Sequence, residues 1–235
     1  MSKPPILVAL DVPTAEEAVR LAEAVGPHVA GFKVGLELLM GPGPAVVAAL
    51  AGEGADVFAD AKLHDIPTTV QHAARQLGRL GARWVTVHAA GGSTQMEAAV
   101  EGLAVGAAGR SAGVLGVTVL TSSGDDTLTE IGVNGTTGKQ TARLARLAAG
   151  AGAEGVICAV KELGVVAEVA PALKRVTPGI RPAGSAAHDQ RRVATPEEAI
   201  TRGADYLVIG RAITAAPDPA AAAAEIARSL GNLAP

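Results

Sequence analysis

The sequence predicts a single-domain (β/α)₈ barrel, the TIM-barrel fold of the α/β class, over residues 1–235. Short apolar runs recur eight times, stretches of helical period rich in Ala, Leu, Glu and Arg separate them, and no Pro/Ser-rich linker divides the chain. Strands that alternate with helices are typical of parallel βαβ units covered by helices. Eight such units in 235 residues fit a barrel, slightly below its usual length of about 250. An open doubly wound sheet is the alternative fold.

The predicted strands are rich in the β-branched and aliphatic residues that suit a buried sheet. In chain order they span residues 6–11, 31–35, 55–61, 83–89, 113–120, 155–159, 174–180 and 205–211. Helices are expected in the intervals, and two of them begin with a Thr-x-x-Glu capping box, at Thr14 and at Thr195. Pro196 then occupies the first helical position of the second one. The alanine-rich stretch 219–230 is expected to form the last helix and to close the barrel.

Composition excludes several classes of protein. Hydrophobic residues make up 49% of the chain and charged residues 18%, which excludes a disordered chain. The net charge of −3 leaves no basic excess for binding nucleic acid. The apolar runs are shorter than the roughly 18 residues of a membrane span, and the first one is too short for a secretory signal. Because Cys158 is the single cysteine, we expect no disulfide, a core role for this thiol and a cytoplasmic location.

Two connections are long, polar and rich in glycine or alanine. Residues 122–140 follow the fifth predicted strand, and residues 182–192 follow the seventh. Both lie after the carboxyl ends of strands, which is the face where barrel enzymes build their active sites. We expect these segments to be loops that exclude water from a site, with tolerated surface insertions as the alternative.

Charged residues gather at the ends of the first three predicted strands. Asp11 ends the first strand, Lys33 lies near the end of the second, and Asp60 and Lys62 end the third. Alternation of side chains along a strand puts Asp60 and Lys62 on one face, which in a barrel can point inward. Neighbouring carboxylates would keep a buried ammonium protonated, so Lys62 is a candidate acid. A plain ion pair at the barrel mouth is the alternative.

The last two strands end in residues that suit a phosphate group. Gly210 and Arg211 follow the eighth strand, and Arg181 follows the seventh. Backbone N–H groups beside a glycine can approach phosphate oxygens, an arginine can bind them bidentately, and barrels often bind phosphate at these loops. The alternative is that Arg211 only pairs with a helix end. The five histidines have no ligand spacing, so no metal site is expected, and His88 is expected either to line the mouth or to pack.

Several motifs together resemble orotidine 5′-phosphate decarboxylase of the bacterial type. They are Asp60-Ala61-Lys62-Leu63-His64-Asp65-Ile66-Pro67, Thr177-Pro178-Gly179-Ile180-Arg181-Pro182 and Asp189-Gln190-Arg191-Arg192. Asp11, Phe32-Lys33-Val34-Gly35, Val117-Thr118-Val119-Leu120-Thr121-Ser122 and Ile209-Gly210-Arg211 follow in the order of that family. The resemblance extends from residue 6 to about residue 219.

The resemblance implies a homodimeric barrel that converts orotidine 5′-monophosphate to UMP and CO₂ without metal or organic cofactor. It implies that Lys62 donates a proton to C6 of the pyrimidine, that Asp60 lies against the substrate carboxylate, and that Asp65 and Thr69 reach the neighbouring subunit's site. The remaining implied contacts are to the ribose from Asp11 and Lys33, to the base from Thr121 or Ser122, and to the phosphate from Gln190, Gly210 and Arg211 with Arg181 nearby. The segment 182–190 is expected to close over the phosphate.

Two other functions remain open at this point. The Asp-x-Lys-x-x-Asp motif also resembles 3-keto-gulonate-phosphate decarboxylases and hexulose-phosphate synthases, which use Mg²⁺ and hold it with a carboxylate from the second strand. This chain has Lys33 there, and an ammonium cannot be a metal ligand. A catalytically silent barrel that senses a sugar phosphate would keep the phosphate residues and would not need Lys62.

Overall fold

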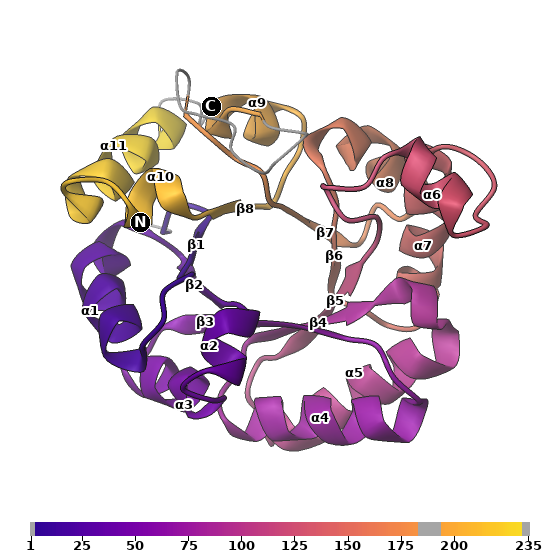
Figure 1. Ribbon diagram of the computed structural model, residues 1–235, viewed down its shortest axis with the longest axis horizontal. Helices are drawn as coiled ribbons and strands as arrows, with labels where there is room; N and C mark the ends of the chain where they lie inside the picture. The colour runs from indigo at the N-terminus through magenta and orange to yellow at the C-terminus, as the bar shows by residue number, and fades with distance from the viewer. Residues whose placement is uncertain (1–2, 183–193, 232–235) are drawn as a thin grey trace.

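Eight parallel strands close into a barrel in sequence order, with the last strand hydrogen-bonded to the first (Figure 1). The computed structural model describes residues 3–182 and 194–231. Its strands are β1 (Ile6–Ala9), β2 (Gly31–Val34), β3 (Asp56–Leu63), β4 (Trp84–His88), β5 (Gly113–Val117), β6 (Gly155–Ile157), β7 (Lys174–Thr177) and β8 (Tyr206–Ile209). The predicted barrel is confirmed, and the open doubly wound sheet is excluded.

Helices form a ring around the strands (Figure 1). They are α1 (Ala15–Val25), α2 (Leu36–Met40), α3 (Ala45–Gly52), α4 (Pro67–Arg79), α5 (Ser93–Ala107), α6 (Asp125–Glu130), α7 (Thr137–Gly150), α8 (Leu163–Val169), α9 (Pro196–Thr201), α10 (Arg211–Thr214) and α11 (Pro219–Gly231), with 3₁₀ turns η1 (Gly26–His28), η2 (Ala89–Gly91) and η3 (Val160–Glu162). Thr14 caps α1 and Thr195 caps α9, each by accepting a hydrogen bond from a glutamate N–H three residues later. The alanine-rich helix α11 contacts α1 and so completes the ring, as predicted.

The segment 122–140 differs from the predicted open loop. It contains the short helix α6, whose N-cap is Gly124, and the first turn of α7, which the Thr136 side chain caps. The Asp125 side chain accepts a hydrogen bond from Thr137 N–H at 2.7 Å and thereby ties the two helices together. Most of the second predicted loop lies outside the described residues. On its flanks, Arg181 N–H donates to the Ala194 carbonyl at 2.9 Å.

The apolar core has two layers. Inside the barrel, one cluster joins side chains from six strands: Leu7, Ala9, Phe58, Trp84, Leu115, Val176 and Val208. The larger cluster fills the space between the strands and the helices, and the thiol of Cys158 is fully buried at its inner edge. Burial raises the pKa of this thiol to about 12, so Cys158 is the inert core residue that was expected.

Across the described parts of the chain, each helix is too short or too polar to cross a membrane.

Charges also cluster around the amino-terminal end of the barrel, opposite the mouth. Glu154, just before β6, accepts hydrogen bonds from Arg83 at 2.6 and 2.7 Å, from Lys174 at 2.9 Å and from Trp84 at 3.2 Å. Burial acts to raise the pKa of Glu154, but these donors outweigh it and hold the pKa at about 2. The network joins the starts of β4, β6 and β7 at the face that barrel enzymes use for stability rather than chemistry.

Candidate active site

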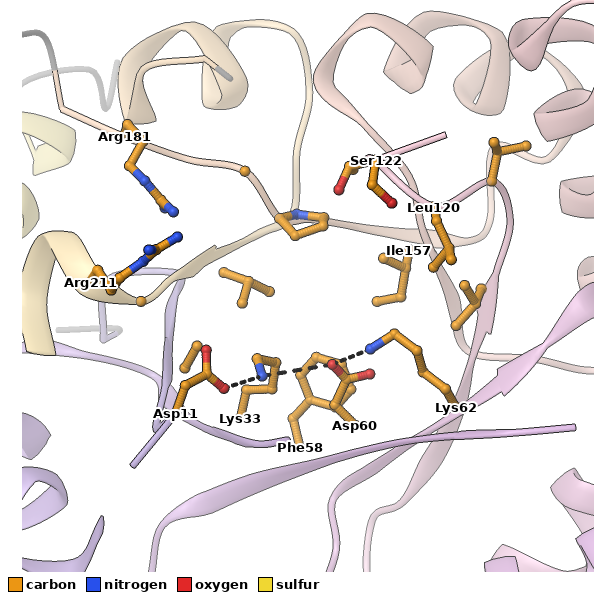
Figure 2. A pocket seen from close by; sticks show the side chains of 18 residues that line it. Asp11, Lys33, Phe58, Asp60, Lys62, Leu120, Ser122, Ile157, Arg181 and Arg211 are labelled. Carbon is orange, nitrogen blue, oxygen red and sulfur yellow. Dashed lines mark hydrogen bonds and ion pairs between the residues drawn. The ribbon is translucent and has the colours of Figure 1, made fainter. Parts of the chain in front are cut away.

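Four charged side chains at the carboxyl ends of β1, β2 and β3 form a line of alternating sign, here called the charge row (Figure 2). The Lys33 ammonium lies 3.1 Å from Asp11 Oδ1 and 3.7 Å from Asp60 Oδ2. The Lys62 ammonium lies 2.7 Å from that same Asp60 oxygen. Only 11% of the Asp60 side chain is exposed, and two cations compensate for the water that it has lost. The structure therefore brings together the four residues that end the first three predicted strands.

Asp60 and Lys62 reach the same cavity by a route that differs from simple alternation. β3 continues to Leu63, beyond its predicted end, and its register against β4 shifts between Ala59 and Leu63. Within this irregularity Lys62 has a φ of 46°, a left-handed conformation that non-glycine residues adopt rarely. The bulge re-aims the lysine side chain toward the carboxylate two residues earlier, which is a recognised use of bulges next to active sites.

Thr86 on β4 supports this bulge, and the sequence analysis did not identify it. Its hydroxyl accepts a hydrogen bond from Lys62 N–H at 2.9 Å and donates one to Asp60 Oδ1 at 2.9 Å. Thr86 is fully buried. A threonine inside a strand is ordinarily a packing residue, so only the register of β3 against β4 reveals this role.

The charge row forms one side of a cavity of about 330 Å³ at the carboxyl end of the barrel. The rest of the lining is mostly apolar: Ala9, Phe58, Val117, Val119, Leu120, Ile157, Pro178 and Val208, with Thr121, Ser122, Gly179 and Gly210. Gly35 leaves room beside the row, because a Cβ there would lie 3.0 Å from both Asp11 Oδ1 and Lys33 Nζ. An enclosure with apolar walls strengthens the electrostatic interactions within it.

Two arginines line the cavity on the side away from Lys62 (Figure 2). Arg211 begins α10 directly after Gly210, and Arg181 follows β7, with its Nη1 donating to the Ile180 carbonyl at 2.8 Å. Both guanidinium groups point into the cavity (Figure 2). The cavity thus has a row of alternating charge along one side and two arginines at the end away from Lys62. Thr121 and Ser122 line it as well, whereas Gln190 lies outside the described residues.

The structure does not bring Asp65 and Thr69 into the cavity of their own chain. Both are exposed, on the turn after β3 and on the first turn of α4. The buried Gln95 of α5 fixes this turn, since it accepts a hydrogen bond from Asp65 N–H at 3.2 Å and donates one to the His88 carbonyl at 2.9 Å. Gln95 is a second residue that the sequence analysis did not identify, and no local motif marks it.

Two histidines near the site form a pair of tilted rings. The rings of His64 and His88 lie 5.5 Å apart, and His88 packs beneath the turn without lining the cavity. Burial lowers the pKa of His88, and the nearby His64 and Lys62 lower it further, while Asp60 opposes them. Within residues 3–182 and 194–231, no group of three or more His, Cys, Asp or Glu side chains could hold a metal ion.

Comparison with known proteins relates the chain to a single protein family. Residues 4–226 match the model of the Orotidine 5'-phosphate decarboxylase / HUMPS family. A protein named orotidine 5'-phosphate decarboxylase from Thermobifida fusca (strain YX) is 51% identical over 228 residues, which cover 96% of this chain and 95% of that protein. One of the same name from Anaeromyxobacter sp. (strain K) is 51% identical over 226 residues, covering 96% and 97%.

The crystal structure of orotidine 5'-phosphate decarboxylase from Lactobacillus acidophilus superposes with a TM-score of 0.84 at 36% identity. It covers 96% of this chain and 98% of that one. The family match spans most of the chain, and the relatives align with it from end to end. This chain therefore belongs to the orotidine 5′-phosphate decarboxylase / HUMPS family.

Proposed function

We propose that this chain decarboxylates orotidine 5′-monophosphate to UMP and CO₂, a step of de novo pyrimidine nucleotide synthesis. The observation that carries the proposal is the contact of 2.7 Å between Lys62 and Asp60, beside a cavity with a cationic end. The substrate carries a carboxylate on the pyrimidine and a phosphate at the other end. An acid next to a carboxylate at one side, and two arginines at the other, match this charge distribution. The relatives that carry this enzyme's name support the assignment.

Lys62 is the residue to which we assign the chemical step. When the bond between C6 and the carboxylate breaks, the electron pair stays on C6, and the Lys62 ammonium donates a proton to that carbon. The neutral amine then regains a proton from solvent. Asp60, held by two ammonium groups, remains a carboxylate beside the leaving group and fixes the Lys62 ammonium where negative charge develops.

Repulsion between the Asp60 carboxylate and the substrate carboxylate is, by itself, too small to account for such a reaction. Two carboxylates about 4 Å apart at an effective dielectric of about 20 repel by roughly 4 kcal/mol. At about 1.4 kcal/mol per factor of ten, this gives about a thousandfold. Slow reactions require much more, so stabilisation of the developing carbanion by a fixed ammonium must contribute the larger part.

The other assignments concern binding. We assign Asp11 and Lys33 to the ribose hydroxyls, Thr121 or Ser122 to the pyrimidine, and Gly210 and Arg211 to the phosphate. Gln190 is assigned to the phosphate as well, with Arg181 close by, and the segment 182–190 is assigned to closure over it. Binding energy from the phosphate, which is remote from the breaking bond, can be used to close the site and to desolvate the charges.

We further infer a cytoplasmic homodimer in which Asp65 and Thr69 complete the neighbouring subunit's site. Their exposure on the turn after β3, outside their own cavity, supports this, since Asp65, the last residue of the Asp-x-Lys-x-x-Asp motif, then remains available to a second chain. A buried thiol at Cys158 is compatible with a reducing compartment.

The Mg²⁺-dependent members of the family are the competing assignment. Lys33 favours the decarboxylase that needs no metal, because its ammonium lies between two carboxylates and cannot coordinate a cation. We propose accordingly that the chain uses no cofactor.

The direct test is to incubate the purified chain with orotidine 5′-monophosphate and to follow the loss of substrate by ultraviolet absorbance. Conversion to UMP is expected. Absence of turnover, with a folded protein, would exclude the proposed activity.

A further inference from the structure

We propose that Thr86 is a positioning residue for this reaction: its single hydroxyl group holds the Lys62 backbone and the Asp60 carboxylate in the arrangement that proton transfer requires. The inference rests on the proposed function for its kinetic consequence. Its structural part rests only on the geometry of β3 and β4, so the two can be tested separately.

The bulge in β3 creates the need for this contact. From Ala59 to Leu63 the strand advances four positions, while its partners on β4 advance only from Val85 to Val87, which is two. β3 therefore carries two extra residues opposite Thr86. Within such a bulge the regular ladder is interrupted, and a buried N–H without a partner is costly. The Thr86 hydroxyl accepts the hydrogen bond from Lys62 N–H in place of a strand carbonyl.

The hydroxyl has one hydrogen, and the geometry determines where it points. Because the oxygen accepts from Lys62 N–H, its own hydrogen remains free to be donated, and it is donated to Asp60 Oδ1 at 2.9 Å. The other oxygen, Asp60 Oδ2, is left for the two ammonium groups. One side chain thus fixes both the backbone that carries the acid and the carboxylate that orients it.

In this arrangement the hydrogen bonds of the Thr86 hydroxyl matter more than the space that it fills. Lys62 has an uncommon left-handed backbone that persists only when its surroundings enforce it. Without the hydroxyl, the bulge loses a hydrogen bond and Asp60 can rotate, so the ammonium is displaced from the reacting carbon. Proton transfer is sensitive to such displacements, whereas the arginine end of the cavity, where the phosphate is assigned, is untouched.

Thr86→Val is the informative variant, because valine keeps the shape and removes the hydroxyl. We expect kcat to fall by about 30- to 100-fold while KM changes by less than about threefold. Thr86→Ser retains the hydroxyl and should recover kcat to within about fivefold of the wild type. The matched control is Thr118→Val: Thr118 is also buried at a strand end, but its hydroxyl donates to the Ile157 carbonyl at 2.7 Å and does not contact the charge row. Its kcat should stay within about twofold.

A second measurement does not depend on activity. Amide hydrogen exchange of Lys62, followed by NMR, should be slow in the wild type and in Thr86→Ser, and at least about tenfold faster in Thr86→Val. Rapid exchange of this amide in the wild type would overturn the proposal even if the valine variant does not fold.

The outcomes separate the two claims. A wild-type protein that fails to convert orotidine 5′-monophosphate refutes the proposed function, while the exchange experiment still tests the contact. A Thr86→Val enzyme with wild-type kcat refutes the positioning role. An equal loss of kcat in Thr86→Val and Thr86→Ser also refutes it, because serine keeps the hydroxyl that valine lacks, and the loss would then not depend on that hydroxyl.

Discussion

Lys62 and Asp60 lie only two residues apart on one strand, yet the ammonium of the first donates a hydrogen bond to the carboxylate of the second at 2.7 Å. The bulge in β3 allows this contact, since it turns the lysine back along its own strand. The pair combines a proton source with an anion that holds the source in place.

Replacing Lys62 by alanine should abolish turnover. The proton donor and the cation beside the developing carbanion are lost together, so we expect a decrease in kcat of at least about four orders of magnitude. The ultraviolet assay measures the rate, and circular dichroism verifies the fold. Lys161→Ala, which removes an exposed ammonium outside the cavity, is the control and should be fully active. Near wild-type turnover by Lys62→Ala would contradict the assignment of the acid.

Replacing Arg211 by alanine should weaken binding through the phosphate alone. We expect kcat/KM for orotidine 5′-monophosphate to fall by about 10²- to 10³-fold, as for the loss of a charge-assisted bidentate contact in an enclosed site. Orotidine, which lacks the phosphate, provides the matched comparison, and its slow turnover should be unchanged. Arg143→Ala, an exposed arginine on α7, should affect neither substrate. Equal losses with both substrates would assign Arg211 to another role.

Mixed dimers test whether two chains share a site. A chain with Asp65→Ala and a chain with Lys62→Ala should each be inactive alone. When the two chains are unfolded and refolded together, activity should return, because each heterodimer contains one intact site to which one chain supplies Lys62 and the other Asp65. If mixing restores no activity although heterodimers form, Asp65 must act within its own chain.

Chelation tests the proposal that this chain needs no metal against the Mg²⁺-dependent alternative. Because Lys33 occupies the place between Asp11 and Asp60, we expect full activity after dialysis against EDTA and no stimulation by Mg²⁺. The ultraviolet assay before and after dialysis is sufficient. A strict requirement for Mg²⁺ would favour the competing assignment.

The Glu154 network should make stability depend on pH. The pKa of Glu154 is lowered from 4.5 to about 2, so its contribution to stability is present above about pH 4.5 and is lost as the pH falls toward 2. Glu154→Gln should reduce the free energy of unfolding at pH 7 by about 1–2 kcal/mol, a value already reduced for solvent screening of a partly exposed group. The difference in urea midpoint between wild type and variant should shrink as the pH is lowered to 3.

A surface pair provides the control for that experiment. Glu198 on α9 and Arg202 at its C-cap form an exposed ion pair at 3.0 Å, and Glu198→Gln should change stability by less than about 0.5 kcal/mol at either pH. A pH-independent loss in Glu154→Gln would show that the network acts by packing and not by charge.

Sequence alone predicted the barrel and the charge row because both depend on short-range patterns. Strand ends in a parallel barrel share one face, so Asp11, Lys33 and Asp60 could be brought together without coordinates. The bulge could not be predicted, since two extra residues in β3 are defined only by pairing with β4. Thr86 and Gln95 were missed for the same reason: each contacts the motif from another element.

In the segment 122–140, by contrast, the local sequence pattern itself is ambiguous. Its Ser, Gly, Asp and Thr residues are typical of loops and of helix caps alike, and only the bond from Thr137 N–H to Asp125 distinguishes the two. Asp65 and Thr69 were assigned by resemblance, and the geometry of one chain leaves their role as a prediction.

The cavity floor and the barrel interior share side chains, and this gives the protein an internal optical reporter. Phe58, Ala9 and Val208 line the cavity and pack in the same cluster as Trp84, the only tryptophan of the chain. Trp84 is 2% exposed; its indole contacts the Tyr206 ring at a tilt of 60° and lies under the Arg83 guanidinium. Its fluorescence originates from a single known position, in the same apolar cluster as side chains that line the cavity. A change in Trp84 fluorescence on titration with UMP would therefore show that binding in the cavity alters the packing inside the barrel.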